Sequence, residues 1–332
     1  MQKITAQMLV EKAVSLLDAG TVNRVLGWKK GEFDYDVTPA VFCDADTLKK
    51  DFVFGDFSGA NLSKYLVSET KKSDAKVLVF LKPCDTYSFN QLLTEHRFDR
   101  ESVYAVALPC EGMADINKIK KITGDGILSI SSNGDKLVVD TIYDGKKEIP
   151  FSDAVSDRCL TCKSKKHVAY DELIGEEGDV LDSNRFDEVE RLEAMTEEER
   201  FAFWQSQLSR CIRCNACRDV CPACTCEKCV FDNSESPVEN KAISDSFEEK
   251  MFHIIRAFHV AGRCTDCGEC SRVCPQNIPL HLLNRKFIKD INTFYGDYQA
   301  GETAFSRAPL VDYTTDDIEP HEAVEKGEGE NA

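Results

Sequence analysis

The sequence is poor in basic residues and has no long hydrophobic run. Its 332 residues include 41 Lys and Arg against 58 Asp and Glu, which leaves a formal net charge of -17. Proteins that bind nucleic acids hold the phosphates with clustered Lys and Arg, so this excess of acid excludes a nucleic-acid partner. It also opposes docking on an anionic membrane surface. No window reaches the roughly 18 apolar residues of a membrane-spanning helix, so we expect no direct membrane insertion.

Common signatures of catalytic and phosphate-binding sites are missing as well. The sequence has no Walker loop, no Gly-x-Gly-x-x-Gly fingerprint after a predicted strand and no recognisable Ser-His-Asp arrangement. Residues 1–20 have apolar residues at helical spacing but carry Lys and Glu, which indicates an amphipathic helix rather than an export signal. We therefore expect a cytoplasmic protein, in a reducing compartment where structural disulfides are uncommon.

Cysteine, in contrast, is abundant, with 16 residues. With disulfides disfavoured by the compartment, zinc and iron–sulfur clusters remain as explanations. Two runs, at residues 211–222 and 264–275, share the pattern C-x2-C-x2-C-x3-C-P. Tetrahedral zinc sites use pairs of C-x2-C separated by a longer loop, and three evenly spaced thiolates do not divide into such pairs. The spacing therefore predicts two 4Fe-4S clusters, because three thiolates on one tight turn reach three corners of a cubane.

The fourth cysteine of each run is expected to bind the cluster of the other run, which is the arrangement in two-cluster ferredoxins. The two predicted ligand sets are Cys211, Cys214, Cys217 and Cys274 for one cluster, and Cys264, Cys267, Cys270 and Cys221 for the other.

Residues 1–155 are predicted to form an α/β domain with parallel strands. Two apolar, β-rich segments, 77–85 and 103–111, each end in Pro-Cys-acid and are each followed by a helical pattern. Because parallel strands end at the same edge of a sheet, Cys84 and Cys110 should lie together where open α/β sheets place their sites. Cys43 follows a weaker version of the same ending. The segment after Cys110 is expected to form a β-hairpin or meander with Asn-Gly and Asp-Gly turns.

The remainder of the chain divides into three predicted parts. Residues 156–195 hold a C-x2-C knuckle, Cys159 and Cys162, and an acidic linker. Residues 196–295 are predicted to be an α-helical, dicluster ferredoxin-like domain, whose first helix is capped by Thr196 with Glu199. Residues 296–332 are acidic, with few apolar residues, and are expected to form an extended tail.

Several large side chains of the helical domain are interpreted as packing residues. Its aromatic residues are more typical of a core than of an electron conduit, and its two central histidines are expected at the core or its rim. These residues are Phe201, Phe203, Trp204, Phe252, Phe258, His253 and His259.

The stretch CIRCNACRDVCPACTC, the segment AFHVAGRCTDCGECSRVCPQNIPL and the KPCD strand end together resemble the iron–sulfur protein of anaerobic sulfite reductase and the beta subunits of cytoplasmic NiFe hydrogenases. The order Pro-Cys84, Pro-Cys110, Cys159-x2-Cys162 is also similar to beta subunits of deazaflavin-reducing hydrogenase and formate dehydrogenase. The resemblance covers most of residues 75–295. It implies an α/β domain that binds a 4Fe-4S cluster, often beside FAD, and passes electrons between subunits.

Carried over by position, the resemblance implies a third 4Fe-4S cluster, with Met113, Lys163 and Lys165 as its neighbours. Its ligands would be Cys84, Cys110, Cys159 and Cys162. The alternative is that the first two are buried small hydrophobes and the knuckle binds nothing. FAD is a further candidate cofactor. The flavin-binding members have a Gly-Gly stretch near the N-terminus, where this chain has only isolated glycines, and that departure counts against a flavin here.

Four cysteines have no assignment: Cys43, Cys224, Cys226 and Cys229. They could donate to a fourth cluster, shield a neighbouring cluster without binding metal, or take part in thiol–disulfide chemistry. We prefer the shielding interpretation.

These observations predict an electron-transfer subunit of a multi-subunit anaerobic redox complex. It would relay single electrons through 4Fe-4S clusters between a flavoprotein subunit that uses flavin or nicotinamide and a catalytic oxidoreductase subunit of the hydrogenase, formate dehydrogenase, sulfite reductase or heterodisulfide reductase type. The alternative is an FAD-containing oxidoreductase subunit that itself oxidises NAD(P)H or a deazaflavin. A metal-stapled interaction module without a redox role is a third possibility.

Overall fold

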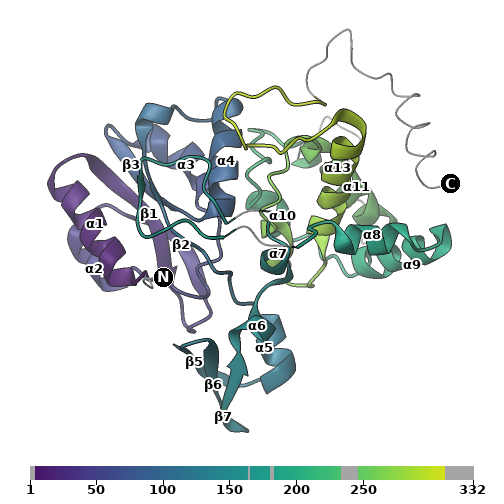
Figure 1. Ribbon diagram of the computed structural model, residues 1–332, viewed down its shortest axis with the longest axis horizontal. Coiled ribbons are helices and arrows are strands. Elements are labelled where there is room, and N and C mark those ends of the chain that lie inside the picture. Colours follow the sequence, from purple (N-terminus) through teal and green to yellow (C-terminus); the bar gives the residue numbers. More distant parts are fainter. Residues whose placement is uncertain (1–3, 164, 180–182, 233–245, 311–332) are drawn as a thin grey trace. The chain divides into compact units, whose positions relative to one another are not determined.

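The computed structural model describes residues 4–163, 165–179, 183–232 and 246–310 (Figure 1). The chain forms two compact units, each made of two segments. The first consists of Met1–Phe89 and His96–Ser183, and the second of Asn90–Glu95 and Asn184–Ala332.

The first unit is built on a five-stranded sheet with the strand order β2-β1-β3-β4-β8. Strands β1, β3, β4 and β8 are parallel, and β2 pairs with β1 in the antiparallel direction. The bounds are β1 Val22–Lys30, β2 Val37–Phe42, β3 Lys76–Leu81, β4 Val103–Ala107 and β8 Glu172–Leu173. The predicted parallel pair, β3 and β4, is confirmed.

Helices cover this sheet because its central strands are apolar on both faces. All residues of β3 after Lys76 are buried, as is expected for a strand between two helical layers. In Figure 1, α1 and α2 lie on one side of the sheet, and α3 and α4 on the other. The helices are α1 Ala6–Asp18, α2 Ala45–Asp51, α3 Ser63–Glu69 and α4 Pro83–Thr94, with single 3-10 turns at η1 Thr70–Lys72 and η2 Arg100–Ser102. Helix α1 confirms the amphipathic helix predicted for the N-terminal residues.

A second, antiparallel sheet follows β4, with the order β5-β6-β7. Its strands are β5 Ile127–Asn133, β6 Lys136–Thr141 and β7 Gly145–Pro150, and α5 Ile116–Thr123 precedes them. Ile119 of the helix is buried with Leu137 and Val139 of the central strand. The predicted meander is thus confirmed, and Gly134 adopts the positive φ of 64° that its Asn-Gly turn requires. The short helices α6 Phe151–Ala154 and α7 Asp157–Leu160 lead out of this sheet.

The described part of the second unit is helical, as predicted. Its elements are α8 Asp187–Glu193, α9 Glu197–Leu208, α10 Ala216–Asp219, η3 Val230–Asp232, α11 Ser246–Val260, α12 Glu269–Arg272 and α13 Leu280–Tyr295. Thr196 and Glu199 form the predicted capping box at the start of α9. Among the described residues, no helix is both long and apolar enough to cross a membrane.

The core of the second unit mixes apolar side chains with cysteines. Leu208, Phe252, Ile278 and Leu280 are buried together with Cys217 and Cys270. The interpretation of the aromatic residues as core residues is wrong for Phe201 and Phe258, which are 61% and 62% exposed. Most of the predicted acidic tail, residues 311–332, lies outside the described residues.

Candidate iron–sulfur centres

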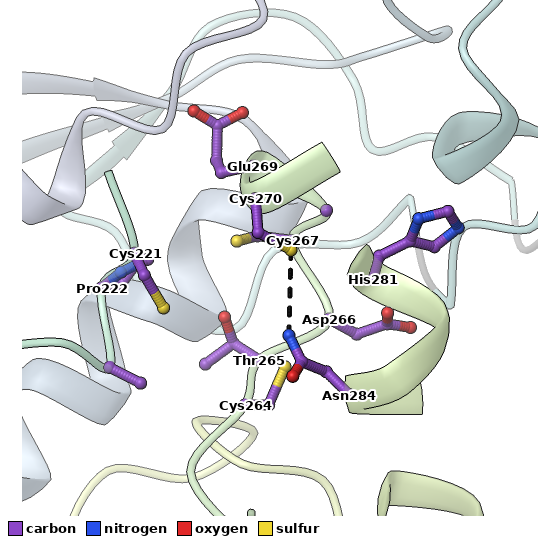
Figure 2. A pocket seen from close by; sticks show the side chains of 12 residues that line it. Cys221, Pro222, Cys264, Thr265, Asp266, Cys267, Glu269, Cys270, His281 and Asn284 are labelled. Atoms are coloured by element: carbon purple, nitrogen blue, oxygen red, sulfur yellow. Dashed lines mark hydrogen bonds between the residues drawn. The ribbon is translucent and has the colours of Figure 1, made fainter. Parts of the chain in front are cut away.

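Four thiols from both cysteine runs line one cavity of the second unit. Cavity B, as we call it, is lined by Cys221, Cys264, Cys267 and Cys270 and holds about 370 Å3 not filled by protein atoms, part of it open to solvent. Figure 2 shows Cys221 facing the three cysteines of the second run. The run 264–275 therefore supplies three thiols, and the run 211–222 supplies the fourth.

The remaining four thiols of the two runs line a matching cavity. Cavity A is lined by Cys211, Cys214, Cys217 and Cys274 and holds about 320 Å3, again partly open to solvent. The two sets are those predicted from the spacing of the runs. Within the described residues, no three or more His, Cys, Asp or Glu side chains are arranged to hold a single metal ion.

The two runs also have the same backbone. In the first, Arg213 and Asn215 have positive φ values of 53° and 62°, and in the second Asp266 and Gly268 have values of 56° and 69°. Left-handed residues on either side of the second cysteine turn the chain tightly, so that three thiols point to one side. A one-turn helix, α10 or α12, then carries the chain to the fourth cysteine.

Four of the thiols that line the two cavities resist ionisation in the absence of a bound cation. Burial raises the pKa of Cys217 to about 11 and that of Cys267 and Cys270 to about 12, and neighbouring cysteines act in the same direction. The pKa of Cys264 is raised well above its ordinary value by burial and by the charge of Asp266. Four thiolates can coexist in such a place only with positive charge between them, which iron supplies.

The two carboxylates that line cavity B form ion pairs. Asp266 forms a 2.7 Å ion pair with Arg285, and Glu269 forms one of 2.7 Å with Arg272. The side-chain amide of Asn284 donates a hydrogen bond to the thiol of Cys270 at 3.8 Å, drawn as the dashed line in Figure 2. Hydrogen bonds to cysteine sulfur favour the charged thiolate and so suit a ligand of iron.

Cavity A is bordered by α11, which carries His253 and Arg256 one turn apart. His253 lines the cavity and is 2% exposed. Burial and the charges of Arg256 and Arg213 lower the pKa of this imidazole to about 3. Arg256 is 4% exposed and donates a 3.0 Å hydrogen bond from Nη2 to the carbonyl of Cys217. His253 thus lies in the interior, as predicted, whereas His259 is exposed.

A third group of thiols lies in the first unit. Cys84 is in the first turn of α4, Cys110 follows β4, Cys159 is in α7 and Cys162 lies two residues after that helix. Burial raises the pKa of Cys84, and the charges of Cys162 and Cys110 raise it further. Cys159 likewise raises the pKa of Cys110, which burial brings to about 11. These effects connect Cys84 with Cys162 and Cys110, and Cys110 with Cys159.

For two of the three residues predicted to lie near these four cysteines, the structure gives an interaction partner. The charge of Lys165 acts on Cys110, and Lys165 is 7% exposed. Lys163 lies 3.7 Å from the centre of the Tyr87 ring. Met113 is buried.

Sequence reasoning missed one residue beside these thiols, Lys82. Lys82 and Asp85 form a 2.7 Å ion pair in which both side chains are 1% exposed, and Lys82 also donates to the carbonyl of Ala60 at 2.9 Å. Although burial opposes its charge, Asp85 and the thiols Cys84 and Cys110 raise the pKa of Lys82. The signal was present in the motif Lys-Pro-Cys-Asp, because a lysine directly after a buried strand needs a counter-charge.

The four unassigned cysteines fall in different places. Cys43 is exposed. The strand before it, β2, is antiparallel to β1, so its carboxyl end lies at the opposite edge of the sheet from those of β3 and β4, and Cys43 does not join Cys84 and Cys110. Cys224 acts electrostatically on Arg256 and Arg263, whereas Cys226 is exposed. Cys229 acts on Arg218.

Comparisons with known proteins agree with this arrangement. Residues 207–278, which contain both runs, match the family described as 4Fe-4S dicluster domain. The F420-dependent formate dehydrogenase subunit beta of Methanocaldococcus jannaschii is 24% identical over 332 residues, or 82% of this chain and 86% of that protein. The chain is a homologue of such beta subunits and carries a 4Fe-4S dicluster domain. The predicted resemblance to formate dehydrogenase beta subunits is thereby confirmed, and the dicluster domain fits an electron-transfer role.

A second relative has similar coverage. The F420-dependent formate dehydrogenase 1 subunit beta of Methanococcus maripaludis is 24% identical over 342 residues, or 83% of this chain and 87% of that protein. Among solved structures, a chain of the xenon-derivatised F420-reducing NiFe hydrogenase complex from Methanosarcina barkeri aligns with 12% identity and a TM-score of 0.38, over 63% of this chain and 87% of that chain.

Proposed function

We propose that this chain is the electron-transfer subunit of a multi-subunit anaerobic redox complex. The observation that carries the proposal is the pair of cavities, each lined by three thiols of one cysteine run and one of the other. When bound, 4Fe-4S clusters supply one-electron chemistry at potentials set by charge, hydrogen bonds and solvent exposure. The chain itself supplies the ligands and controls those three properties.

In this proposal, Cys211, Cys214, Cys217 and Cys274 bind one cluster, and Cys264, Cys267, Cys270 and Cys221 bind the other. These two assignments are supported by how well the cysteines that line each cavity suit a 4Fe-4S cluster. Each set of four thiols lines one cavity, Cys217 and Cys270 are buried, and Asn284 already donates a hydrogen bond to the thiol of Cys270. The cluster-binding region remains within the proposed domain 196–295.

A third cluster in the first unit is proposed on Cys84, Cys110, Cys159 and Cys162. The mutual electrostatic effects of these thiols support it. So does the position of Cys84 and Cys110 at the carboxyl ends of two adjacent parallel strands, where open α/β sheets place their sites. Lys82 and Lys165 add positive charge beside the thiolates and so balance part of the negative charge of such a cluster.

We propose a cytoplasmic complex with two kinds of partner, a flavoprotein subunit and a catalytic oxidoreductase subunit. The named relatives are subunits of formate dehydrogenases, so a catalytic partner of the formate dehydrogenase type is the one that the comparisons favour. The chain's own glycines near the N-terminus give no support to a bound FAD. Gly27 lies in β1 against the ring of Phe52, and Gly31 against the carboxylate of Asp36.

The test is anaerobic reconstitution of the full chain, followed by counts of iron, acid-labile sulfide and flavin and by electron paramagnetic resonance after reduction. We expect about twelve iron atoms per chain for three clusters, paramagnetic signals on reduction, and no stoichiometric flavin. About eight iron atoms would remove the third cluster alone. A reconstituted protein without any reducible signal would overturn the electron-transfer role, and one FAD per chain would favour an oxidoreductase subunit instead.

A further inference from the structure

Cavities A and B have the same backbone but different charges at equivalent positions. The residue before the second cysteine is Arg213 in the first run and Asp266 in the second, and both have a positive φ. Two residues after that cysteine, the first run has Ala216 and the second has Glu269. The surroundings of cavity A are therefore more positive than those of cavity B, although the ligands are the same.

The carboxylates of cavity B act on its thiols despite their arginine partners. Asp266 raises the pKa of Cys264, and Glu269 raises that of Cys267, in each case as the largest charge effect. Asp266 and Glu269 line the cavity, and within the described residues their ion-pair partners Arg285 and Arg272 do not.

Cavity B also has a histidine, but its ring is engaged elsewhere. Nδ1 of His281 lies 2.8 Å from the hydroxyl of Ser271. In Figure 2 its ring points away from the sulfur atoms.

Cavity A contains an imidazole with unmet hydrogen bonds. His253 lines it and is 2% exposed, and neither ring nitrogen has a hydrogen-bond partner among the described residues. A buried donor without a partner is destabilising, so such groups are few in native structures, and one that lines a cavity points to a ligand. Sulfide and thiolate sulfur are acceptors, and the imidazole has an N–H to donate whether it is neutral or protonated.

Arg256 acts on both cavities and does not distinguish them. It bonds to the carbonyl of Cys217, which lines cavity A, and its charge acts on Cys221 and Cys270, which line cavity B. Apart from Asn284, which donates to the thiol of Cys270 in cavity B, the cavities differ in His253 and in the exchange of Arg213 for Asp266 and of Ala216 for Glu269.

We infer that His253 donates a hydrogen bond to sulfur of the cluster in cavity A, and that this bond, with the charge difference between the runs, gives cavity A the higher reduction potential. Reduction adds one negative charge to a cluster. Hydrogen-bond donors and positive charge stabilise the reduced form, whereas Asp266 and Glu269 oppose it in cavity B. The inference rests on the proposed clusters. It adds the direction in which an electron moves between them, because a single electron is held more tightly by the cluster in cavity A.

The experiment is a redox titration of the reconstituted full chain, followed by electron paramagnetic resonance, on four variants. His253→Leu removes the donor, and we expect one midpoint potential to fall by about 59 mV, a tenfold change for a one-electron couple. His253→Gln keeps an N–H donor and should restore most of that shift. Glu269→Gln should raise a different, lower midpoint. His259→Leu changes an exposed histidine on the same helix and should move nothing.

Iron content of each variant is measured first, because a variant that fails to bind clusters reports on folding and not on potential. At full iron content, the inference is overturned if His253→Leu moves no midpoint potential. It is also overturned if the midpoint potential that His253→Leu moves is lower than the one that Glu269→Gln moves. Both results would leave the electron-transfer role intact. A wild-type chain without reducible signals would instead contradict the proposed function itself.

Discussion

The ion pair of Lys82 and Asp85 shows why single residues in the first unit are sensitive to substitution. Both side chains are 1% exposed, so each charge depends on the other for stabilisation. We expect Lys82→Met to lower the free energy of unfolding by about 3–5 kcal/mol, because it leaves Asp85 buried and uncompensated. The double variant Lys82→Met with Asp85→Leu should recover much of the loss. The measurement is anaerobic denaturant unfolding of the full chain.

A matched control for this prediction is Lys29→Met. Lys29 pairs with Asp51 at 3.0 Å, but its side chain is 52% exposed, so its removal should cost less than about 1 kcal/mol. Equal losses for Lys29→Met and Lys82→Met would show that the buried pair has no special role.

Cys274 gives a second prediction for a single residue. It lies in the run 264–275 but lines cavity A with the thiols of the other run. Cys274→Ala should therefore change the same paramagnetic signal as Cys211→Ala, whereas Cys264→Ala should change a different one. Cys226→Ala, at an exposed cysteine, should leave both signals in place. A Cys274→Ala spectrum that matched Cys264→Ala would contradict crossed ligation.

For single residues, the sequence predicts which cysteines gather in each cavity, but not which neighbouring side chains act on those cysteines. The spacing of the two runs predicts which thiols line which cavity, because the geometry is local and repeated. His253 cannot be told from a packing histidine, since its face of α11 is apolar and its neighbours come from the distant run 211–217. Lys82 is missed although the motif Lys-Pro-Cys-Asp contains its counter-charge, Asp85, because the structure is needed to show that both side chains are buried.

At the scale of secondary-structure elements, an ion pair between helices α8 and α13 leads to a testable prediction. Glu193 of α8 lies 2.6 Å from Lys286 and 2.5 Å from Lys289, both on α13. Burial opposes the charge of Glu193, but the hydrogen bonds from the two lysines lower its pKa. Glu193→Gln should lower stability by about 1 kcal/mol, measured as the anaerobic thermal midpoint. Glu188→Gln, on the same helix and 43% exposed, is the control and should cost less.

The pH dependence of this contact has a definite sign. A carboxylate with a lowered folded-state pKa stabilises the fold above its ordinary value, here 4.5, and the contribution is lost as the pH falls through the folded value. The difference between wild type and Glu193→Gln should therefore be constant from about pH 8 to about pH 6. A difference that shrank across that range would mean that another group holds the two helices together.

Strand β2 shows that a sequence pattern at the end of a strand does not reveal the direction of that strand in the sheet. Residues 77–85 and 103–111 are predicted as parallel strands because a helix separates them. The segment before Cys43 resembles them in its ending alone, and only residues 31–36 separate it from β1. A parallel connection needs a dozen or more residues, so a link this short requires a hairpin and an antiparallel strand. The amide of Gly31 indeed bonds to the carbonyl of Asp36 at 2.6 Å within that turn.

At the scale of the whole chain, the two units differ in what holds them together. The sheet of the first unit has a large apolar core, including Val77, Leu78 and Phe80, all fully buried. The second unit places Cys217 and Cys270 among its buried residues, so the binding energy of the proposed clusters would contribute to its folding.

Removal of iron should therefore affect the units unequally. After anaerobic chelation, we expect hydrogen-exchange protection to fall sharply over residues 207–232 and 246–278 and to persist in β1, β3 and β4. Equal loss in both regions would mean that the clusters support the entire chain.

The exchange of the fourth cysteine between the runs has a consequence for how the protein matures. Cys221 closes cavity B, and Cys274 closes cavity A, so each cavity is complete only when the other run is in place. A newly made chain that has acquired one cluster has already brought both runs together for the next, which makes the second acquisition easier. Loading should thus be close to all-or-none, and oxygen damage to one cluster should quickly cost the protein the other.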